Sequence, residues 1–307
     1  MKNNKKVLVT GSSGFLGSHI VDSLINNGYS VIGFDLEEVS YNQNLSHFFS
    51  GDISDYNKLS KAMEGCDYVY HLAGLADIGE SVQDPEKAIK VNILGTHNIL
   101  KASVEMEIKR FIFASSIYVY SELGGFYRVT KQACEKIIDE YQKSYGLNYT
   151  ILRYGSLYGT RANNFNSIRN MLEEALTNNE IIRRGDGEEI REYINVIDAA
   201  KLSVRSLDSD YINKHLIITG NQSLKIKELL LMIKEIFNNK IKISYKPGDE
   251  LHHYQITPFS FRSQVAERLT PTTFIDIGQG IMEVLNELSQ EKFKQEKNSK
   301  IGLREKN

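Results

Sequence analysis

The chain has 307 residues, of which 25% are charged and 41% hydrophobic, and its formal net charge is −2. This composition is ordinary for a soluble globular protein with one large domain or two lobes that share a cleft. The small net charge provides no global field to recruit nucleic acid or an anionic membrane, and no apolar run approaches the length of a membrane span. Two isolated cysteines, Cys66 and Cys134, exclude a disulfide framework and a zinc site. We expect a cytoplasmic protein with free thiols and with no nucleic-acid or membrane partner.

Short apolar runs alternate with longer amphipathic segments through the first half of the chain. The apolar runs predict buried strands at 6–10, 29–35, 47–51, 68–73, 110–115 and 149–154. Apolar residues at helical spacing predict helices at 15–27, 56–64, 85–106 and 127–145. This alternation predicts an α/β fold with a doubly wound parallel sheet of the Rossmann type. Such sheets bind ligands at the carboxyl ends of their strands, so the chemistry should lie in the loops that follow the strands.

The pattern changes after Gly159, where the sequence predicts helices at 165–177, 197–207 and 281–288, a strand at 215–219 and an amphipathic segment at 225–237. We expect residues 1–160 to form the NAD-binding domain, joined by a return segment at about 190–220. Residues 161–189 and 221–290 would form a smaller C-terminal substrate lobe. The charged tail 291–307 has few apolar residues, and we expect it to be frayed or disordered.

A glycine-rich loop follows the first predicted strand and opens the first predicted helix. Gly11 permits a tight turn, Gly14 lets the backbone approach a pyrophosphate, and Gly17 lets the helix lie close to the strand. The free N–H groups at the helix start attract phosphate. The next strand ends in Asp35, whose carboxylate can accept both ribose hydroxyls and repels a 2′-phosphate. Together these features predict a site for NAD rather than NADP.

Tyr127 and Lys131 lie four residues apart near the start of a predicted helix, so they share one helix face. A lysine there can stabilise a phenolate, and a bound nicotinamide cation would add to the effect. We therefore expect the pKa of Tyr127 to be lowered far enough for it to act as a base. The preceding strand ends in Ser115 and Ser116, which could place a hydroxyl beside the same reacting oxygen.

These motifs occur in the order found in extended short-chain dehydrogenases/reductases, which include the NAD-dependent epimerases and dehydratases of nucleotide sugars. The resemblance covers roughly residues 5–290, and an ordered set is more specific than any single motif. The motifs are GSSGFLG at 11–17, Asp35, GDI at 51–53, HLAG at 71–74, VN at 91–92, SS at 115–116, YRVTK at 127–131, LRYGSLYG at 152–159 and REYINVID at 191–198.

The resemblance implies that Ser116, Tyr127 and Lys131 form the catalytic triad. It implies cofactor contacts for Gly11, Ser13, Gly14, Phe15, Leu16, Gly17, Asp35, Asp52, Ile53, Leu72, Ala73, Gly74, Asn92, Ser115, Tyr127, Lys131 and Tyr154. It implies substrate contacts for Ser116, Tyr118, Arg191 and Lys246, the last two to a diphosphate. Three of the motif residues also have plain structural interpretations. Asp52 could be a helix N-cap, His71 a packed strand residue, and Arg191 a member of a surface ion pair.

The sequence departs from the family pattern at several positions. The segment 121–126 is short where relatives carry a longer substrate wall. Ile117 and Tyr118 occupy the positions at which sugar 4,6-dehydratases carry Asp-Glu, which disfavours that reaction. Ser156 replaces an Asn that is common in the epimerases. The paired histidines His252 and His253 have no third ligand at a suitable spacing, so we expect no metal site.

The resemblance favours an NAD-dependent epimerase that transiently oxidises a hydroxyl of a UDP- or GDP-linked sugar. The alternatives are an NAD-dependent sugar oxidoreductase (a keto-sugar reductase or dehydrogenase) and a cofactor-binding relative without catalysis. Relatives pair two helices, here at 85–106 and 127–145, into a four-helix bundle, so we expect a homodimer. Ala133, Ile137 and Ile138 fit a buried seam, and core packing explains them equally well. The sugar, the nucleotide and the oxidised carbon stay open.

Overall fold

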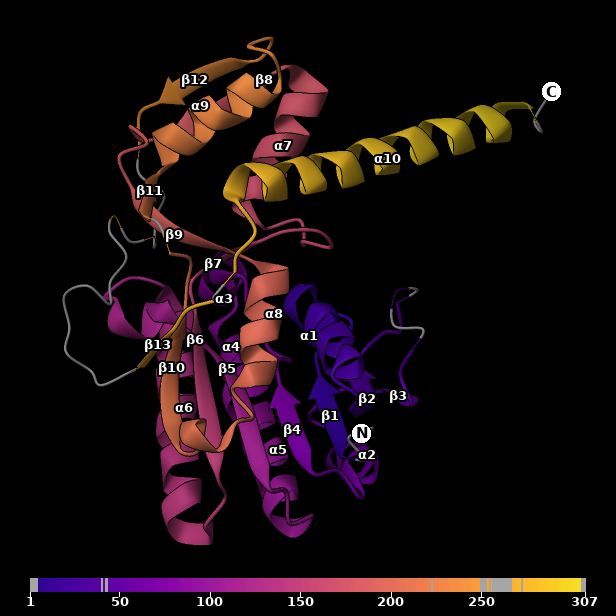
Figure 1. Ribbon diagram of the computed structural model, residues 1–307, viewed down its shortest axis with the longest axis vertical. Coiled ribbons are helices and arrows are strands. Elements are labelled where there is room, and N and C mark those ends of the chain that lie inside the picture. The colour runs from indigo at the N-terminus through magenta and orange to yellow at the C-terminus, as the bar shows by residue number, and fades with distance from the viewer. Residues whose placement is uncertain are drawn as a thin grey trace.

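The computed structural model describes residues 5–39, 41, 44–221, 223–248, 253, 255, 267–271 and 273–304. Its main element is an eight-stranded sheet in which all neighbouring strands are parallel (Figure 1). In spatial order the strands are β13 (Glu267–Leu269), β10 (Lys214–Ile218), β6 (Tyr149–Tyr154), β5 (Arg110–Ser116), β4 (Tyr68–His71), β1 (Lys6–Thr10), β2 (Ser30–Asp35) and β3 (His47–Ser50). This confirms the predicted doubly wound parallel sheet.

Helices cover both faces of the sheet, which explains why β4 and β6 are buried along their whole length. One face packs against α1 (Phe15–Asn26) and α8 (Val196–Arg205), and the other against α2 (Tyr56–Met63), α5 (Gly95–Glu105) and α6 (Gly125–Tyr145) (Figure 1). The strand order reverses between β1 and β4. In sheets of this kind, the crevice at such a reversal binds the ligand.

A smaller lobe lies beyond the carboxyl ends of the strands, at the top of Figure 1. Its apolar core joins α7 (Ser167–Asn178), α9 (Ile226–Ile236) and the first half of α10 (Ile277–Arg304). Two small sheets complete it: β12 (Lys242–Lys246) with β8 (Glu180–Arg184), and β11 (Ser223–Lys225) with β9 (Ile190–Asn195) and β7 (Ser156–Tyr158). Because β7 follows β6 directly, the lobe is attached at the carboxyl ends of the strands, where the site is expected.

The structure differs from the sequence-based elements in several places. The helix expected at 85–106 is divided into α4 (Pro85–Ala88), a π-helix η1 (Ile89–Leu94) and α5. An extra short helix, α3 (Ile78–Gln83), precedes it. The strand β13 joins the main sheet beside β10 although it falls within the segment assigned to the lobe. No helix in the described part of the chain is long and apolar enough to cross a membrane.

The charged tail is helical as far as Arg304, which contradicts the expectation of a frayed segment. Two contacts hold its first turns against α7: Arg169 lies 2.9 Å from Glu291, and Lys292 Nζ donates to the Leu176 carbonyl at 3.1 Å. Its Glu, Lys and Gln residues have good intrinsic helix propensity. The expectation failed because docking of the first turns supplies the nucleus from which such a sequence propagates. The far end of α10 extends beyond the body of the molecule (Figure 1).

Candidate active site

The glycine loop is built so that only glycine fits at its two ends. A Cβ on Gly17 would lie 1.9 Å from the Gly11 carbonyl oxygen, and a Cβ on Gly11, where φ is +72°, would lie 2.6 Å from the Ala73 nitrogen. Gly14 is the N-cap of α1, no side chain caps this helix end, and its first turn has no acidic residue. The loop therefore presents backbone N–H groups and the positive end of the helix dipole, an arrangement that fits a pyrophosphate.

Asp35 closes the adenosine side of this loop. Its Oδ2 accepts a hydrogen bond from the Ser13 backbone at 2.8 Å, and its Oδ1 accepts one from Leu36 at 2.7 Å. Burial raises the pKa of Asp35, although both backbone hydrogen bonds oppose the rise. A carboxylate fixed beside the glycine loop at the carboxyl end of β2 suits the two hydroxyls of a ribose. The residues present therefore fit NAD.

Asn92 supports the loop after β4. Its Oδ1 accepts from the Leu75 backbone at 2.7 Å, and its Nδ2 donates to the Leu75 carbonyl at 3.1 Å and to Thr130 Oγ1 at 3.0 Å. A Cβ on Gly74 would lie 2.9 Å from this Oδ1. Asn92 thus fastens the loop that contains Leu72, Ala73 and Gly74 onto α6, and both amide hydrogens already have acceptors within the protein.

Other expected cofactor residues lie around this crevice with their side chains engaged. Asp52 accepts from the Ser54 backbone at 2.7 Å in a local turn, and the N-cap of α2 is Asp55 instead, so the helix-cap alternative for Asp52 is wrong. Ile53 is buried against Gly95. Tyr154 lies in the core under α8, with its hydroxyl 2.6 Å from Ser203 Oγ, so the structure does not bring that hydroxyl to the crevice.

His71 is a packed strand residue, as the structural alternative predicted. Its ring is 1% exposed and bridges two hydroxyls, Thr10 Oγ1 and Thr96 Oγ1, each at 2.9 Å. Burial, followed by the nearby charge of Lys131, holds the pKa of His71 well below its usual range. We therefore assign it no role as a base.

Ser116, Tyr127 and Lys131 come together at the carboxyl end of β5. The Ser116 side chain lies close enough to Tyr127 to lower the pKa of its phenol. Lys131 lies one turn further along α6, with Nζ 5.9 Å from the centre of the Tyr127 ring and donating to the Ala114 carbonyl at 2.8 Å. The Ser81 hydroxyl of α3 accepts from the Tyr127 backbone at 3.2 Å and fixes the start of α6. A phenol, a hydroxyl and an ammonium group in this arrangement can move a proton to or from a bound alcohol.

The pKa values of Tyr127 and Lys131 are set mainly by burial. Burial raises the pKa of Tyr127, and the interaction with Ser116 only partly offsets the rise. Burial also lowers the pKa of Lys131, while Cys134 and then Glu135 act in the opposite direction. For the protein's own side chains desolvation is the dominant effect on Tyr127, and the lowering expected with a bound nicotinamide cation stays a prediction.

Tyr118 forms a wall beside this group. It lies in the turn η2 (Ile117–Tyr120), its ring is edge-on to that of Tyr127 at 6.2 Å, and its hydroxyl lies 2.7 Å from His253 Nδ1. Sequence reasoning considered His253 only as a metal ligand and missed this contact. Its neighbour His252 lies outside the described residues. No group of three or more potential metal ligands occurs among the residues that the structure describes.

Arg191 and Lys246 lie on different sheets of the lobe. Arg191 is buried on β9, which runs between the lobe and the main sheet, so it is not a surface residue. Lys246 is the last residue of β12 and borders an open pocket of about 410 Å³ with Gly185, Asp186, Tyr245 and Pro247. The contacts of Arg191 and Lys246 with a diphosphate stay predictions.

Comparison with known proteins agrees with this arrangement. Residues 7–218 match the NAD dependent epimerase/dehydratase family. The chain belongs to this family. Within it, the chain is 31% identical to a putative UDP-glucose 4-epimerase of Methanocaldococcus jannaschii, over 91% of this chain and 97% of that relative. It is 29% identical to a UDP-glucose 4-epimerase of Halalkalibacterium halodurans, over 78% of this chain and 83% of the relative.

Solved structures of family members superpose over nearly the whole chain. The UDP-glucose 4-epimerase of Thermotoga maritima, solved with UDP-glucose, is 26% identical with a TM-score of 0.82, covering 93% of this chain and 99% of the other. The UDP-N-acetylglucosamine 4-epimerase of Methanobrevibacter ruminantium, solved with UDP-N-acetylmuramic acid, is 28% identical with a TM-score of 0.79, covering 94% and 100%. The fold of this epimerase/dehydratase therefore includes the lobe as well as the cofactor-binding sheet.

Proposed function

We propose that this protein is an NAD-dependent 4-epimerase of a UDP-linked sugar. The observation that carries the proposal is the placement of Ser116 beside Tyr127, with Lys131 one turn away, at the carboxyl end of β5. The relatives named above support UDP as the nucleotide, because their names specify UDP-linked sugars and none specifies GDP. They also support position 4 of the sugar as the carbon whose configuration changes.

In this proposal each side chain has a defined task. NAD, when bound, supplies the site that accepts the hydride from the sugar carbon and returns it. Tyr127 accepts the proton of the sugar hydroxyl, and Ser116 donates a hydrogen bond to the same oxygen. Lys131 places a positive charge beside the phenolate. Because burial raises the pKa of Tyr127, the phenolate needs this charge and that of the oxidised nicotinamide together.

The remaining site residues have the following roles in the proposal. Gly11, Ser13, Gly14, Phe15, Leu16 and Gly17 hold the pyrophosphate, and Asp35 holds the adenosine ribose. Asp52, Ile53, Leu72, Ala73, Gly74 and Ser115 line the crevice, while Asn92 and Tyr154 shape it from behind. Tyr118 contacts the sugar, and Arg191 contacts the diphosphate. Lys246, at the end of β12, is the second basic contact to the diphosphate.

The test uses the purified protein with UDP-glucose, UDP-N-acetylglucosamine and UDP-glucuronic acid in separate reactions. Proton NMR should detect the 4-epimer of at least one of them with no net change in absorbance at 340 nm. Tyr127→Phe should bind the same nucleotide sugar without forming product. Net reduction or oxidation of the cofactor would replace the proposal by a sugar oxidoreductase. If the wild type and Tyr127→Phe both bind NAD and neither converts any of the three sugars, the protein is better explained as a cofactor-binding relative without catalysis.

We also propose a homodimer, supported by apolar side chains exposed on the packed helices η1 and α6. Ile89 and Leu94 on η1 are 43% and 54% exposed, and Phe126 and Val129 on α6 are 38% and 45% exposed. Ile138 lies in the core against the sheet, 1% exposed, which agrees with the core-packing interpretation of this position and not with the seam. A dimer would remove the apolar surface from water.

The proposed division into domains follows from the sheet. Residues 1–160 and the return segment around 190–220 would form the NAD-binding domain, because β10 joins the main sheet and α8 packs on its face. Residues 161–189 and most of 221–290 would form the substrate lobe around its own apolar core. We place the protein in the cytoplasm, which agrees with its two free, buried cysteines.

A further inference from the structure

A buried ion pair lies directly behind the catalytic group. Glu135 on α6 and Arg153 on β6 have side chains that are only 7% and 4% exposed. Arg153 donates from Nε to Oε1 at 3.0 Å and from Nη2 to Oε2 at 2.6 Å, so the pair is bidentate. Two charges buried together are tolerated only when their hydrogen-bonding groups are well satisfied. The contacts around the pair therefore matter.

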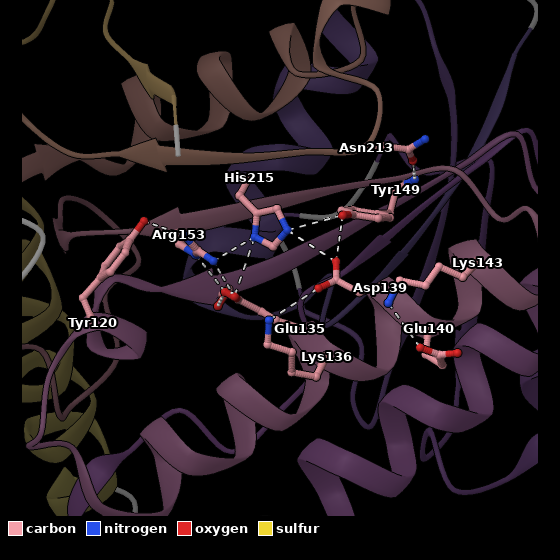
Figure 2. Close-up of polar contacts among 11 residues, drawn as sticks. Tyr120, Glu135, Lys136, Asp139, Glu140, Lys143, Tyr149, Arg153, Asn213 and His215 are labelled. Atoms are coloured by element: carbon pink, nitrogen blue, oxygen red, sulfur yellow. Dashed lines mark hydrogen bonds and ion pairs between the residues drawn. The ribbon is translucent and has the colours of Figure 1, made fainter. Parts of the chain in front are cut away.

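Both sides of the pair are tied to other elements. Arg153 also donates to the hydroxyl of Tyr120 and to His215 Nδ1, the latter at 2.8 Å (Figure 2). His215 in turn lies 3.5 Å from Asp139, which accepts a hydrogen bond from the Tyr149 hydroxyl at 2.7 Å. Figure 2 shows this chain of contacts running from Tyr120 through Arg153 and His215 to Asp139 and Tyr149. Arg153 is thus held from several directions and cannot turn away from Glu135.

Glu135 also connects the pair to the catalytic edge. Its Oε1 accepts a hydrogen bond from Ser115 Oγ at 2.6 Å, and one turn earlier on α6 Lys131 donates to the Ala114 carbonyl at 2.8 Å. Two polar side chains of α6 therefore hold two consecutive residues of β5. The next residue of that strand is Ser116, so the position of its hydroxyl relative to Tyr127 depends on both contacts.

The charge on Glu135 acts on Lys131. Burial alone would raise the pKa of Glu135, but its contacts with His215, Arg153 and Ser115 outweigh burial and bring the pKa down to about 2. Glu135 is therefore ionised at neutral pH. The other titratable groups around Lys131 are Tyr127 and Cys134 on α6 and His71 on β4.

These three neighbours are neutral at neutral pH. Burial raises the pKa of both Tyr127 and Cys134 above its ordinary value, and it holds the pKa of His71 well below its own. Cys134 and then Glu135 raise the pKa of Lys131, and of these two groups only Glu135 is ionised at neutral pH.

We propose that Glu135, locked in place by Arg153, is a positioning residue of the reaction that sets Ser116 against Tyr127 and keeps the buried Lys131 an ammonium ion. The catalytic part of this inference rests on the proposed function. The effect of Glu135 on the protonation of Lys131 does not depend on it. Removing the carboxylate should leave Lys131 with less to oppose its desolvation. The ammonium would then lose its proton at lower pH, and the phenolate of Tyr127 would lose its counter-charge.

The first experiment compares Glu135→Gln with Glu189→Gln. Glu189 forms an equally buried ion pair with Arg183 in the lobe, at 2.7 Å with side chains 5% and 7% exposed, and it is the matched control for loss of a buried charge pair. The wild-type protein and both variants are labelled with [ε-13C]lysine, and the Lys131 signal is assigned by its absence in Lys131→Arg. We expect Lys131 to titrate at lower pH in Glu135→Gln and at the wild-type pH in Glu189→Gln.

Two further variants keep the test decisive if Glu135→Gln fails to fold. Glu135→Gln/Arg153→Met removes both charges, so no uncompensated ion remains buried, and it should still lower the pH at which Lys131 titrates. Glu135→Asp keeps the charge and should leave that titration near its wild-type position. An unchanged Lys131 titration in every variant that lacks the carboxylate would overturn the proposal.

The catalytic consequence is measured with a UDP-sugar that the wild-type protein epimerises. In Glu135→Gln we expect kcat to fall by about 10²-fold, as for a displaced reacting group, with a small change in KM. We also expect the alkaline limb of the kcat profile to move to lower pH. If kcat falls while the alkaline limb of its pH profile stays in place, Glu135 has only a structural role, and the proposed effect of its charge on Lys131 is overturned. If the wild type epimerises none of the sugars, the proposed function fails while the lysine titration still decides this inference.

Discussion

The Tyr118 hydroxyl and Nδ1 of His253 are 2.7 Å apart, which joins the turn after β5 to a residue 135 positions further along the chain. The two rings are edge-on, with centroids 6.1 Å apart and planes at 72°. Because Tyr118 also packs edge-on against Tyr127, the pair forms a wall next to the proposed base. The sequence predicts that the short segment 121–126 leaves the substrate wall more open on this side, and the contact of His253 with Tyr118 lies there.

Tyr118→Phe should weaken substrate binding while leaving the chemistry largely intact. The ring that packs against Tyr127 is kept, and only the hydrogen bond to His253 is lost. One such bond contributes about 1 kcal/mol, so we expect KM for the nucleotide sugar to rise by about fivefold with kcat within twofold. Steady-state kinetics on the UDP-sugar substrate measures both constants.

The matched variants are His253→Ala and the double variant with Tyr118→Phe. If the two side chains act as a unit, each single change and the double change should raise KM to a similar extent. Additive effects would mean that Tyr118 and His253 contact the substrate independently. An unchanged KM in all three proteins would exclude the pair from the substrate wall.

Gly17→Ala should disrupt the cofactor site through the backbone. The added Cβ would meet the Gly11 carbonyl oxygen at 1.9 Å, so α1 must move away from β1. Such overpacking lowers the free energy of unfolding by about 1–3 kcal/mol, sometimes more, and here it also opens the loop that fits the pyrophosphate. We expect a lower melting temperature and no NAD released from the purified variant, as detected by mass spectrometry.

Gly14→Ala provides a contrast within the same loop. Its Cβ would lie 3.3 Å from the Gly11 carbonyl oxygen, a tight but tolerable contact. It would stand on the surface that the pyrophosphate approaches. We expect near wild-type stability and weaker NAD binding by calorimetry. A loss of stability equal to that of Gly17→Ala would contradict this account of the loop.

Glu135 should contribute to stability only above acidic pH. Its pKa is lowered to about 2 in the folded protein, below an unfolded value of about 4.3. For a lowered carboxyl pKa, the stabilisation is fully present above the unfolded pKa and is lost as pH falls through the folded pKa. It amounts to about 3 kcal/mol. Urea unfolding of wild type and Glu135→Gln should therefore show a difference in free energy that shrinks as pH falls from about 5 toward 2.

Val129→Glu should dissociate the proposed dimer into monomers. Val129 is 45% exposed on α6, and a carboxylate there would have to be buried without a partner at the seam. Light scattering should give twice the mass of one chain for the wild type and a single chain mass for the variant. Leu231→Glu, on α9 of the lobe at a site that is 57% exposed, is the control and should keep the dimer mass. A wild-type monomer at micromolar concentration would contradict the dimer.

The local patterns of the chain were sufficient to predict the parallel sheet, the glycine loop and the spacing of Tyr127 and Lys131. Strand and helix periodicity depend on neighbours in sequence, and the order of strands and helices restricts the topology. The glycines of the loop are likewise required by contacts among a few neighbouring residues. For these features, sequence and structure agree closely: β1 and β6 have the predicted bounds.

Only the tertiary structure decided which distant residues meet. Glu135 and Arg153, Tyr118 and His253, and the docking of Glu291 on Arg169 join positions that no local pattern connects. The sign of the pKa shift of Tyr127 was also decided there, because burial depends on everything packed around the ring. A sequence specifies its local geometry through short-range sterics, whereas charge, burial and long-range contacts arise only when the elements pack together.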